Sequence, residues 1–314
     1  MTVTIDKSLA MVFPGQGSQS VGMLADLAAH NPQVGETFGE AGDVLQYDLW
    51  KLVQEGPEAE LNQTDRTQPA MLAAGVSVWR VWQAHGGAVP SVMAGHSLGE
   101  YTALVCAGAL DFATAVALVA ARGRCMQDAV PPGVGAMAAL LGLDDVTVAY
   151  VCTRAADGEV VEPVNFNSPG QVVIAGNVAA VERAIALAKE AGAKRAVTLP
   201  VSVPSHCALM KPAAEEFAQQ LEQTLITQPA IPVVQNVDAV MQDQPEIIRD
   251  NLGKQLYSPV QWVSSVHAMH AHGMTRMLEA GPGKVLAGLC RRIDKRIASG
   301  SVYDPDTLAA ALAP

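Results

Sequence analysis

Residues 91–100 of the chain read Ser91-Val92-Met93-Ala94-Gly95-His96-Ser97-Leu98-Gly99-Glu100. A short apolar run ends here in the pattern Gly-x-Ser-x-Gly, and helix-forming residues follow directly. In the order strand, sharp turn and helix, this pattern is typical of a nucleophilic serine raised to the edge of a sheet. Backbone N–H groups at the start of the helix can stabilise an oxyanion. We therefore predict that Ser97 is a nucleophile; the alternative is an ordinary tight turn whose serine caps the helix.

The composition favours a compact globular protein and argues against several classes of partner. Half of the 314 residues are apolar and 16% are charged, and the net charge of −11 disfavours nucleic acid and anionic membranes. The five cysteines are scattered without metal or disulfide spacing, which indicates reduced thiols in a cytoplasmic protein. No signal peptide and no apolar run of 18 residues is visible, so we expect neither export nor a membrane span.

Apolar runs alternate with helical patterns on both sides of this stretch. A strand over 9–13 runs into a glycine-rich loop, 14–18, which we expect at the same sheet edge as Ser97. The loop lacks the Gly-Lys-Ser/Thr of a phosphate cradle. The remaining pattern predicts helices over 32–45, 48–54, 68–85, 111–129, 207–222, 245–256, 262–271 and 284–293, and strands over 233–237 and 276–279. Strands separated by helices imply an α/β fold with a mostly parallel sheet covered on both faces.

The middle of the chain has a different order. Strands are predicted over 136–141, 160–166, 171–175 and 194–199, with helices over 144–156 and 177–191, the second capped by Asn177. This β-α-β-β-α-β order is that of a small ferredoxin-like domain. We therefore predict a discontinuous catalytic body, 1–130 and 203–314, with an inserted subdomain, 131–202.

His206 is the candidate base for Ser97. It lies in Val203-Pro204-Ser205-His206-Cys207, where the chain returns from the insert, and loops at domain junctions often build sites. The alternative is a histidine that caps the next helix. His96 is predicted to be structural because neighbours at a sharp turn point apart. No Asp or Glu stands out as a third member, so a backbone carbonyl could orient the imidazole.

Arg122 is the second informative residue. It falls on a helical stripe that is otherwise apolar, with Phe112, Ala115, Val119 and Met126. A buried guanidinium needs an anion. That anion could be an internal Asp or Glu, or a carboxylate on the substrate bound side-on by the guanidinium.

Several separate motifs, in register over essentially the whole chain, resemble those of malonyl-CoA:acyl carrier protein transacylases. They are Phe13-Pro14-Gly15-Gln16-Gly17-Ser18-Gln19, Gly95-His96-Ser97-Leu98-Gly99-Glu100, Arg122-Gly123, Asn165-Phe166-Asn167-Ser168-Pro169-Gly170-Gln171, Val203-Pro204-Ser205-His206 and Gly281-Pro282-Gly283. The resemblance implies an α/β-hydrolase-like body with a ferredoxin-like insert. It also implies a ping-pong transfer of malonyl from CoA to the phosphopantetheine thiol of acyl carrier protein.

The resemblance also implies a role for each matching position. Ser97 would be acylated and His206 would be its base, with the backbone N–H groups of Gln16 and Leu98 as the oxyanion hole. Arg122 would bind the malonyl carboxylate, and the backbone carbonyl of Gln255 would orient His206. Gln68 and Asn167 would line the pocket. The implied enzyme is a monomer that uses malonyl-CoA as substrate and needs no bound cofactor or metal.

The acyl carrier protein of this family is acidic, so a local basic surface is expected for this transient partner. The candidates are Lys194-Arg195 and Arg291-Arg292 with Lys295-Arg296, and ordinary solvated charge is the alternative. Two other functions remain open. A serine hydrolase or thioesterase would share the serine and histidine but would give Arg122 no purpose, and a non-catalytic binding module would use Ser97 only as a cap.

Overall fold

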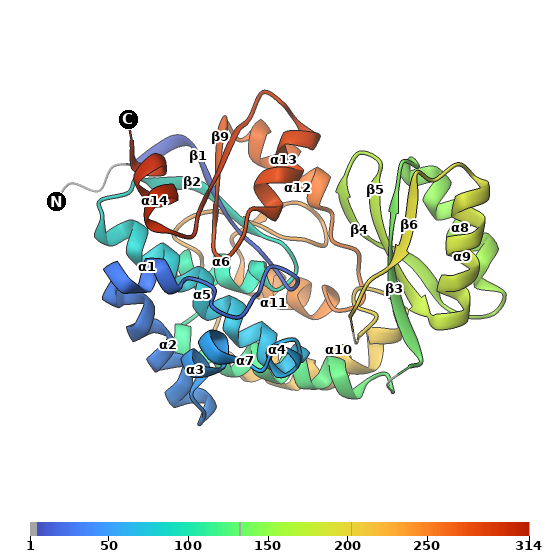
Figure 1. Cartoon of the computed structure of the whole chain (residues 1–314), viewed down its shortest axis with the longest axis horizontal. Helices are drawn as coiled ribbons and strands as arrows, with labels where there is room; N and C mark the ends of the chain where they lie inside the picture. Colours follow the sequence, from blue (N-terminus) through green and yellow to red (C-terminus); the bar gives the residue numbers. More distant parts are fainter. Residues whose placement is uncertain (1–4, 132, 202, 314) are drawn as a thin grey trace.

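The computed structural model describes residues 5–131, 133–201 and 203–313. Two sheets organise these residues, a larger one in the body and a smaller one at one end of the molecule (Figure 1). In the described part, the larger sheet has six strands in the order β10-β9-β1-β2-β7-β8, all parallel to their neighbours except β8. They are β1 (Ile5–Phe13), β2 (Val89–Gly95), β7 (Val233–Val234), β8 (Met241–Gln242), β9 (Arg276–Ala280) and β10 (Ala298–Val302).

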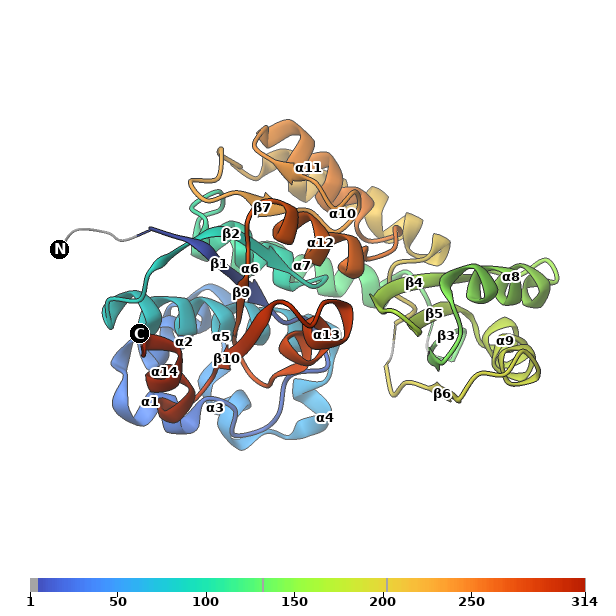
Figure 2. The same cartoon turned by 90° about the horizontal axis from the view of Figure 1, so that it is seen from above.

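Helices cover both faces of this sheet because alternate residues of its strands are apolar on both sides. In β1, Leu9, Met11 and Phe13 join one buried core, and Ala10 and Val12 join another. The second core is covered by α12 (Trp262–Ala271) and α13 (Val285–Ile293), which lie above the sheet in Figure 1 and are seen from their own side in Figure 2. The first core takes in α1 (Ala25–His30), α2 (Pro32–Leu45), α3 (Leu49–Glu55), α5 (Thr64–Ala84), α6 (Gly99–Cys106), α7 (Phe112–Asp128), α10 (Lys211–Gln223), α11 (Pro245–Lys254) and α14 (Pro305–Leu312). The remaining short helices are α4 (Glu58–Leu61) and η1 (Ala208–Met210).

The smaller sheet is antiparallel, with the order β4-β5-β3-β6. Its chain order is β3 (Gly135–Leu141), α8 (Asp145–Ala156), β4 (Val161–Ser168), β5 (Gln171–Asn177), α9 (Val178–Glu190) and β6 (Arg195–Thr198). The two helices pack against the sheet around a third apolar core. No helix in the described ranges combines the length and the apolarity that a bilayer span needs.

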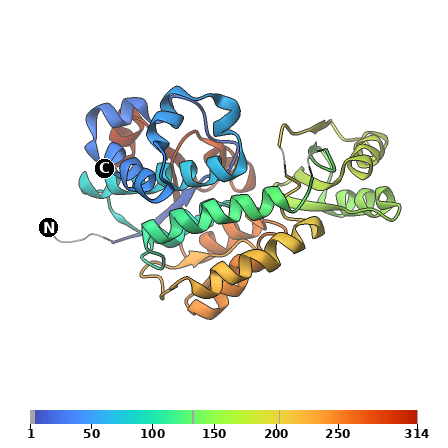
Figure 3. The same cartoon turned by 90° about the horizontal axis from the view of Figure 1, so that it is seen from below.

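The smaller sheet is tied to the body near the carboxyl edge of β2. The helix α7 leads into it and α10 leads back, and the two helices run side by side (Figure 3). Strand β4 also bonds to the body directly, because Phe166 donates its N–H to the Val260 carbonyl and Val260 donates to Val164. A loop of the body and an edge strand of the smaller sheet therefore share a ladder of backbone hydrogen bonds.

The predicted order of elements agrees with the structure, but several details differ. The strand predicted over 233–237 is limited to Val233–Val234, and the helix predicted from 207 begins at Lys211. The helix predicted from residue 68 begins at Thr64, so Pro69 lies inside α5 rather than in its first turn. Asn177 stands at the N-terminus of α9, but its Oδ1 accepts from the Val160 N–H instead of capping the helix. Strands β8 and β10 and helices α4 and α14 were not predicted; β10 consists mostly of small residues without an apolar pattern. Pro132 and Ser202, beside the predicted domain junctions, lie outside the described residues.

Candidate active site

Ser97 occupies the sharp turn between β2 and α6. Its φ of 51° is in the left-handed region, where a residue other than glycine is strained by about 1–3 kcal/mol and needs support from its surroundings. The flanking glycines are required sterically. A Cβ on Gly95 would lie 1.8 Å from the carbonyl carbon of Gly99, and a Cβ on Gly99 would lie 2.1 Å from the Phe13 carbonyl oxygen. The strand and the helix thus approach as closely as the Gly-x-Ser-x-Gly pattern requires.

His206 faces Ser97 across the turn. Its Nε2 lies 2.8 Å from the Ser97 Oγ, and its Nδ1 lies 2.7 Å from the Gln255 carbonyl oxygen. Since a carbonyl only accepts, Nδ1 carries the proton and Nε2 is free to accept from the serine hydroxyl. His206 also has a positive φ, 68°, and its backbone N–H donates to the Leu256 carbonyl. The segment of Gln255 and Leu256 thereby fixes both the backbone and the ring of His206.

The His206 ring is held neutral. Burial, and then the positive charge of Arg122, lower the pKa of His206 to about 3. A neutral imidazole at physiological pH can take the proton from Ser97. Among the described residues no carboxylate is hydrogen-bonded to the ring, so a backbone carbonyl stands where a triad has its acid.

The loop after β1 packs against the Ser97 turn. A Cβ on Gly15 would lie 2.5 Å from the His96 carbonyl oxygen and 3.8 Å from the Leu98 nitrogen. This contact brings the backbone of Gln16 beside the start of α6. Neither the Gln16 N–H nor the Leu98 N–H donates to an acceptor within the described residues, so both are available to an oxyanion.

Arg122 on α7 is fully buried, with 0% of its surface exposed. Its guanidinium donates to the Gln68 Oε1 at 2.8 Å and to the Gln255 Oε1 at 2.9 Å. These are neutral amide oxygens, and no carboxylate within the described ranges forms an ion pair with it. Two bonds use two of the five N–H donors of an arginine. The guanidinium therefore retains donors for an anionic ligand, and burial lowers its pKa from the usual value.

The neighbouring glycine explains how Arg122 reaches Gln68. A Cβ on Gly123 would lie 2.6 Å from the Asp65 Cα, so α7 and the first turn of α5 cross in close contact. Gln68 lies one turn further along α5, and its Nε2 approaches the Met126 sulfur at 3.6 Å. Gly123 thus allows α7 to pack closely against α5, and this close packing brings Arg122 within hydrogen-bond distance of Gln68.

Two polar residues beside the turn carried no prediction from the sequence, Glu100 and Asn236. Glu100 is fully buried, and its Oε2 accepts from the Asn236 N–H at 2.8 Å and from the Gln255 Nε2 at 2.9 Å. Burial raises the pKa of Glu100 to about 7. The Asn236 side chain bonds both Gly95 and Ser97. The available signal was a polar pair, Gln235-Asn236, directly after a short apolar run that ends at the same sheet edge.

The other sequence candidates are placed at different distances from this cluster. Asn167 accepts from His96 at 2.8 Å, and the His96 ring also packs on Trp262, so His96 links the turn to β4. His267, His270 and His272 belong to no group within the described residues that could hold a metal ion. Arg292 donates to the Gln171 side chain.

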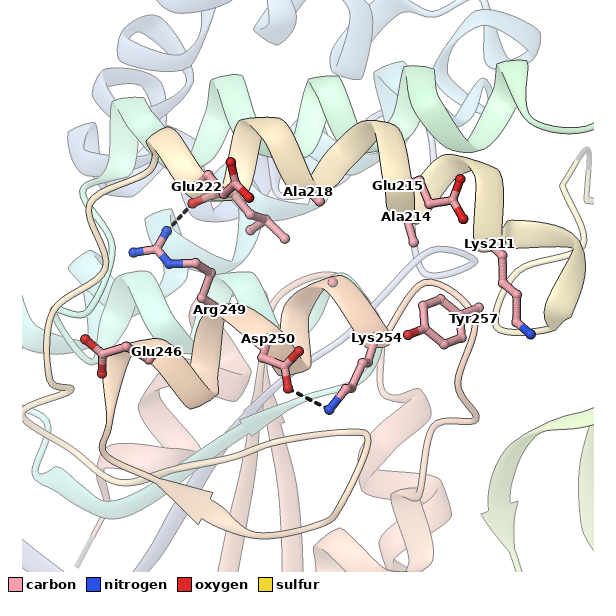
Figure 4. A pocket seen from close by; sticks show the side chains of 12 residues that line it. Lys211, Ala214, Glu215, Ala218, Glu222, Glu246, Arg249, Asp250, Lys254 and Tyr257 are labelled. Atoms are coloured by element: carbon pink, nitrogen blue, oxygen red, sulfur yellow. Dashed lines mark hydrogen bonds and ion pairs between the residues drawn. The ribbon is translucent and has the colours of Figure 1, made fainter.

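A groove between α10 and α11 lies away from this cluster. It has a volume of about 590 Å³, an apolar floor and a charged rim on which Lys254 pairs with Asp250 at 2.6 Å (Figure 4). None of the candidate catalytic residues lines it. The candidate catalytic residues therefore gather at the carboxyl edge of β2, away from this groove.

Comparisons with known proteins show which family the chain resembles. The acyl transferase domain family matches residues 10–302. The malonyl CoA-acyl carrier protein transacylase of Escherichia coli K12 is 60% identical over 303 residues, which is 96% of this chain and 98% of that protein. A crystal structure of an acyl carrier protein S-malonyltransferase from Vibrio cholerae is 60% identical with a TM-score of 0.94, covering 96% and 99% of the two chains. A malonyl-transacylase solved in complex with a type II polyketide acyl carrier protein is 57% identical with a TM-score of 0.96, covering 97% and 99%.

Proposed function

The chain belongs to the acyltransferase family of malonyl-CoA:acyl carrier protein transacylases, and we propose that it transfers malonyl through an ester on Ser97. The activity is that of the family: a malonyl group moves from coenzyme A to acyl carrier protein. The observation that carries the residue assignment is the line from the Gln255 carbonyl through both His206 nitrogens to the Ser97 Oγ. It aligns a base and its orienting group on one hydroxyl.

The first half of the reaction acylates the enzyme. The His206 Nε2 takes the Ser97 hydroxyl proton as Oγ attacks the thioester carbon of malonyl-CoA. The tetrahedral oxyanion lies at the N–H groups of Gln16 and Leu98, which typically contribute about 3–4 kcal/mol each. When the intermediate collapses, the carbon–sulfur bond breaks and His206 returns the proton to the CoA sulfur. The second half repeats these steps in reverse, with the phosphopantetheine thiol of the carrier as the nucleophile.

Arg122 supplies the selectivity for malonyl. It is a buried cation whose bonded partners are neutral amides, so a substrate carboxylate can form a bidentate pair with its unused donors. Gln68 and Gln255 hold the guanidinium in place before substrate arrives. The Gln255 amide also donates to the Ser97 carbonyl oxygen at 3.1 Å, so the same side chain contacts Arg122 and the nucleophilic residue. Asn167 would line the outer part of the pocket through its bond to His96.

Acyl carrier protein is the partner that the related complex supports. We propose that it docks on the basic residues Arg291 and Arg292 of α13 and Lys295 after it, together with Lys194 and Arg195 at the start of β6, all of which are exposed. Arg296 contributes less because Asp294 pairs with it at 2.6 Å. Transfer to the carrier should weaken with salt in the wild type and lose that dependence after charge reversal of Arg291 and Arg292. An unchanged salt dependence would place the docking surface elsewhere.

The finer description of the fold follows the same reasoning. The β3-α8-β4-β5-α9-β6 order and the antiparallel β4-β5-β3-β6 sheet support a ferredoxin-like insert over 131–202. The parallel sheet with Ser97 after β2 supports an α/β-hydrolase-like body over 1–130 and 203–314. Five free cysteines support a reducing, cytoplasmic setting, and we propose a monomer that needs no bound cofactor.

A transfer assay tests the proposed function. The enzyme is incubated with malonyl-CoA, with and without carrier protein bearing its phosphopantetheine arm, and free malonate and malonyl-carrier are measured. We expect malonyl-carrier when the thiol is present and little free malonate when it is absent. Rapid release of malonate without any acceptor would instead identify a serine hydrolase.

A further inference from the structure

A cluster of buried polar side chains, Glu100, Asn236 and Gln255, is hydrogen-bonded to the backbone of the Ser97 turn. We propose that Asn236 is a positioning residue that holds the Ser97 turn in its reactive conformation, and that Glu100 fixes Asn236 in place. The proposal rests on the proposed role of Ser97 as the acylated nucleophile. It assigns to both residues an action on Ser97 and none on the substrate.

Sheet pairing brings Asn236 to the turn. Strand β7 runs parallel to β2, with Met93 beside Val233 and Ala94 beside Val234. Two residues further along, Asn236 reaches the level of the turn. Its Nδ2 donates to the Gly95 carbonyl at 2.7 Å and its Oδ1 accepts from the Ser97 N–H at 2.6 Å. The Asn236 side chain thus bonds to the residue before His96 and to the residue after it.

The orientation of this amide is fixed by its partners. The Gly95 carbonyl can only accept and the Ser97 N–H can only donate, so the oxygen and nitrogen of the Asn236 side chain cannot exchange. The bond from the Ser97 N–H to the Asn236 Oδ1 therefore holds the peptide between His96 and Ser97 in one orientation. Because Ser97 has a strained φ of 51°, losing this bond would let the peptide between His96 and Ser97 rotate toward a relaxed conformation. Oγ would then leave the 2.8 Å contact with His206.

Glu100 connects Asn236 to the other residues of the candidate site. One oxygen of its carboxyl group accepts from the Asn236 backbone and from the Gln255 side chain. The Gln255 amide in turn donates to the Ser97 carbonyl and accepts from Arg122, while its backbone carbonyl accepts from His206. One buried carboxyl group therefore connects the end of β7, the turn and the segment that holds the base.

The test compares two single substitutions at buried asparagines. Asn236→Ala should slow acylation of Ser97 by malonyl-CoA and acetyl-CoA by the same factor, on the order of 10–100-fold, with little change in KM. The two substrates should be affected equally because the substitution does not alter Arg122, which binds the malonyl carboxylate. The matched control is Asn31→Ala. Asn31 is also buried and donates from Nδ2 to a backbone carbonyl, that of Leu27, at a helix junction in the body. It should lose comparable stability at an unchanged acylation rate.

A conservative variant covers the case in which Asn236→Ala does not fold. Asn236→Asp keeps an oxygen for the Ser97 N–H and loses the donor to the Gly95 carbonyl, so its rate should fall between those of Asn236→Ala and the wild type. The proposal is overturned if the folded Asn236 variants acylate at the wild-type rate, if they lose malonyl transfer but retain acetyl transfer, or if Asn31→Ala slows equally.

A second readout separates this inference from the proposed function. Labelling by a serine-directed fluorophosphonate reports how reactive Ser97 is and needs neither malonyl nor a carrier. We expect Asn236→Ala to label more slowly than Asn31→Ala by the same factor as in acylation. If the wild type labels at Ser97 but never accepts malonyl, the proposed function fails while the positioning role is still measured. Equal labelling rates for the two variants overturn the positioning role alone.

Discussion

Glu100 and Glu279 are two buried glutamates in similar electrostatic settings with different partners. Each has none of its surface exposed, and burial raises the pKa of each to about 7. Glu279 is the penultimate residue of β9 and accepts from the Ala287 N–H at 2.9 Å, in the first turn of α13. Glu100 accepts from the Asn236 backbone and from the side chain of Gln255, which holds Arg122. Burial and pKa alone therefore do not distinguish a glutamate that supports a helix end from one that supports the candidate active site. The hydrogen-bond partners distinguish them.

This difference in partners defines two regions, in which substitutions should have different effects. The elbow region contains Ser97, Glu100 and the groups bonded to them. The brace region contains Glu279 and the start of α13. We expect changes in the elbow region to alter rates and changes in the brace region to alter stability.

The largest expected effect in the elbow region comes from His206→Ala. Removing the base should slow malonyl-Ser97 formation by about 10²–10⁴-fold, because the serine hydroxyl then loses its proton to water alone. Rapid-quench intact mass spectrometry measures the rate, and Glu279→Gln provides a control that should acylate normally. Normal acylation by His206→Ala would contradict the expectation that changes in the elbow region alter the rate.

Arg122→Ala should have the next largest effect. The malonyl carboxylate would enter a buried site without its partner, at a cost of roughly 2–5 kcal/mol by analogy with desolvated charge pairs. The kcat/KM for malonyl-CoA should fall by about 30- to 5,000-fold, while that for acetyl-CoA should fall much less. Competition between the two thioesters in one reaction measures the ratio directly. An equal loss on both substrates would show that the arginine only supports the fold.

Substitutions of the two glutamates sharpen the comparison itself. Glu100→Gln keeps an oxygen for the N–H groups of Asn236 and Gln255, so acylation should stay within about threefold of the wild type. Glu100→Met removes that acceptor and should slow acylation on the order of 10–100-fold. Glu279→Met should lower Tm and leave the acylation rate of the folded enzyme unchanged. A rate loss shared by both methionine variants would contradict the assignment of the two regions.

The smallest expected effect on the rate is that of Glu279→Gln, which should alter the pH dependence of stability. The pKa of Glu279 is raised from an ordinary 4.5 to about 7, so between these values the folded state binds a proton that the unfolded state releases. The free energy of unfolding therefore falls as pH rises through this window, by on the order of 3 kcal/mol for this group. Glu279→Gln removes this contribution and should flatten the pH profile.

Denaturant unfolding at pH 5 and pH 8 measures this change. The stability difference between the two pH values should become smaller by roughly that amount in Glu279→Gln. A profile identical to that of the wild type would mean that Glu279 is ionised in the folded protein at both values.

Much of the site could be predicted from local sequence. The Gly-x-Ser-x-Gly pattern indicates Ser97 because the steric requirement at Gly95 and Gly99 is local, and Arg122 stands out on an apolar helical stripe. The structure places His206, which the sequence marks by its position after the insert, at hydrogen-bond distance from Ser97. The Gln255 carbonyl came only from the family resemblance, since a backbone acceptor leaves no trace in the side-chain pattern.

The rest depends on contacts between distant segments. Asn236 reaches the turn because β7 pairs with β2 across about 140 residues, and no local pattern contains that register. Glu100 is visible in the motif, but its partners come from two other loops. Strand β10 forms because β9 offers it a parallel partner, although its own residues are mostly small and show no apolar pattern. In each case the missing information is a long-range pairing and not a propensity.

The most direct test of the central claim is peptide-level mass spectrometry of enzyme quenched after mixing with malonyl-CoA. The account predicts a malonyl group on the peptide that contains Ser97, lost when carrier protein with a free phosphopantetheine thiol is added, and absent in Ser97→Ala. A malonyl group on any other residue, or an adduct that persists in Ser97→Ala, would contradict it.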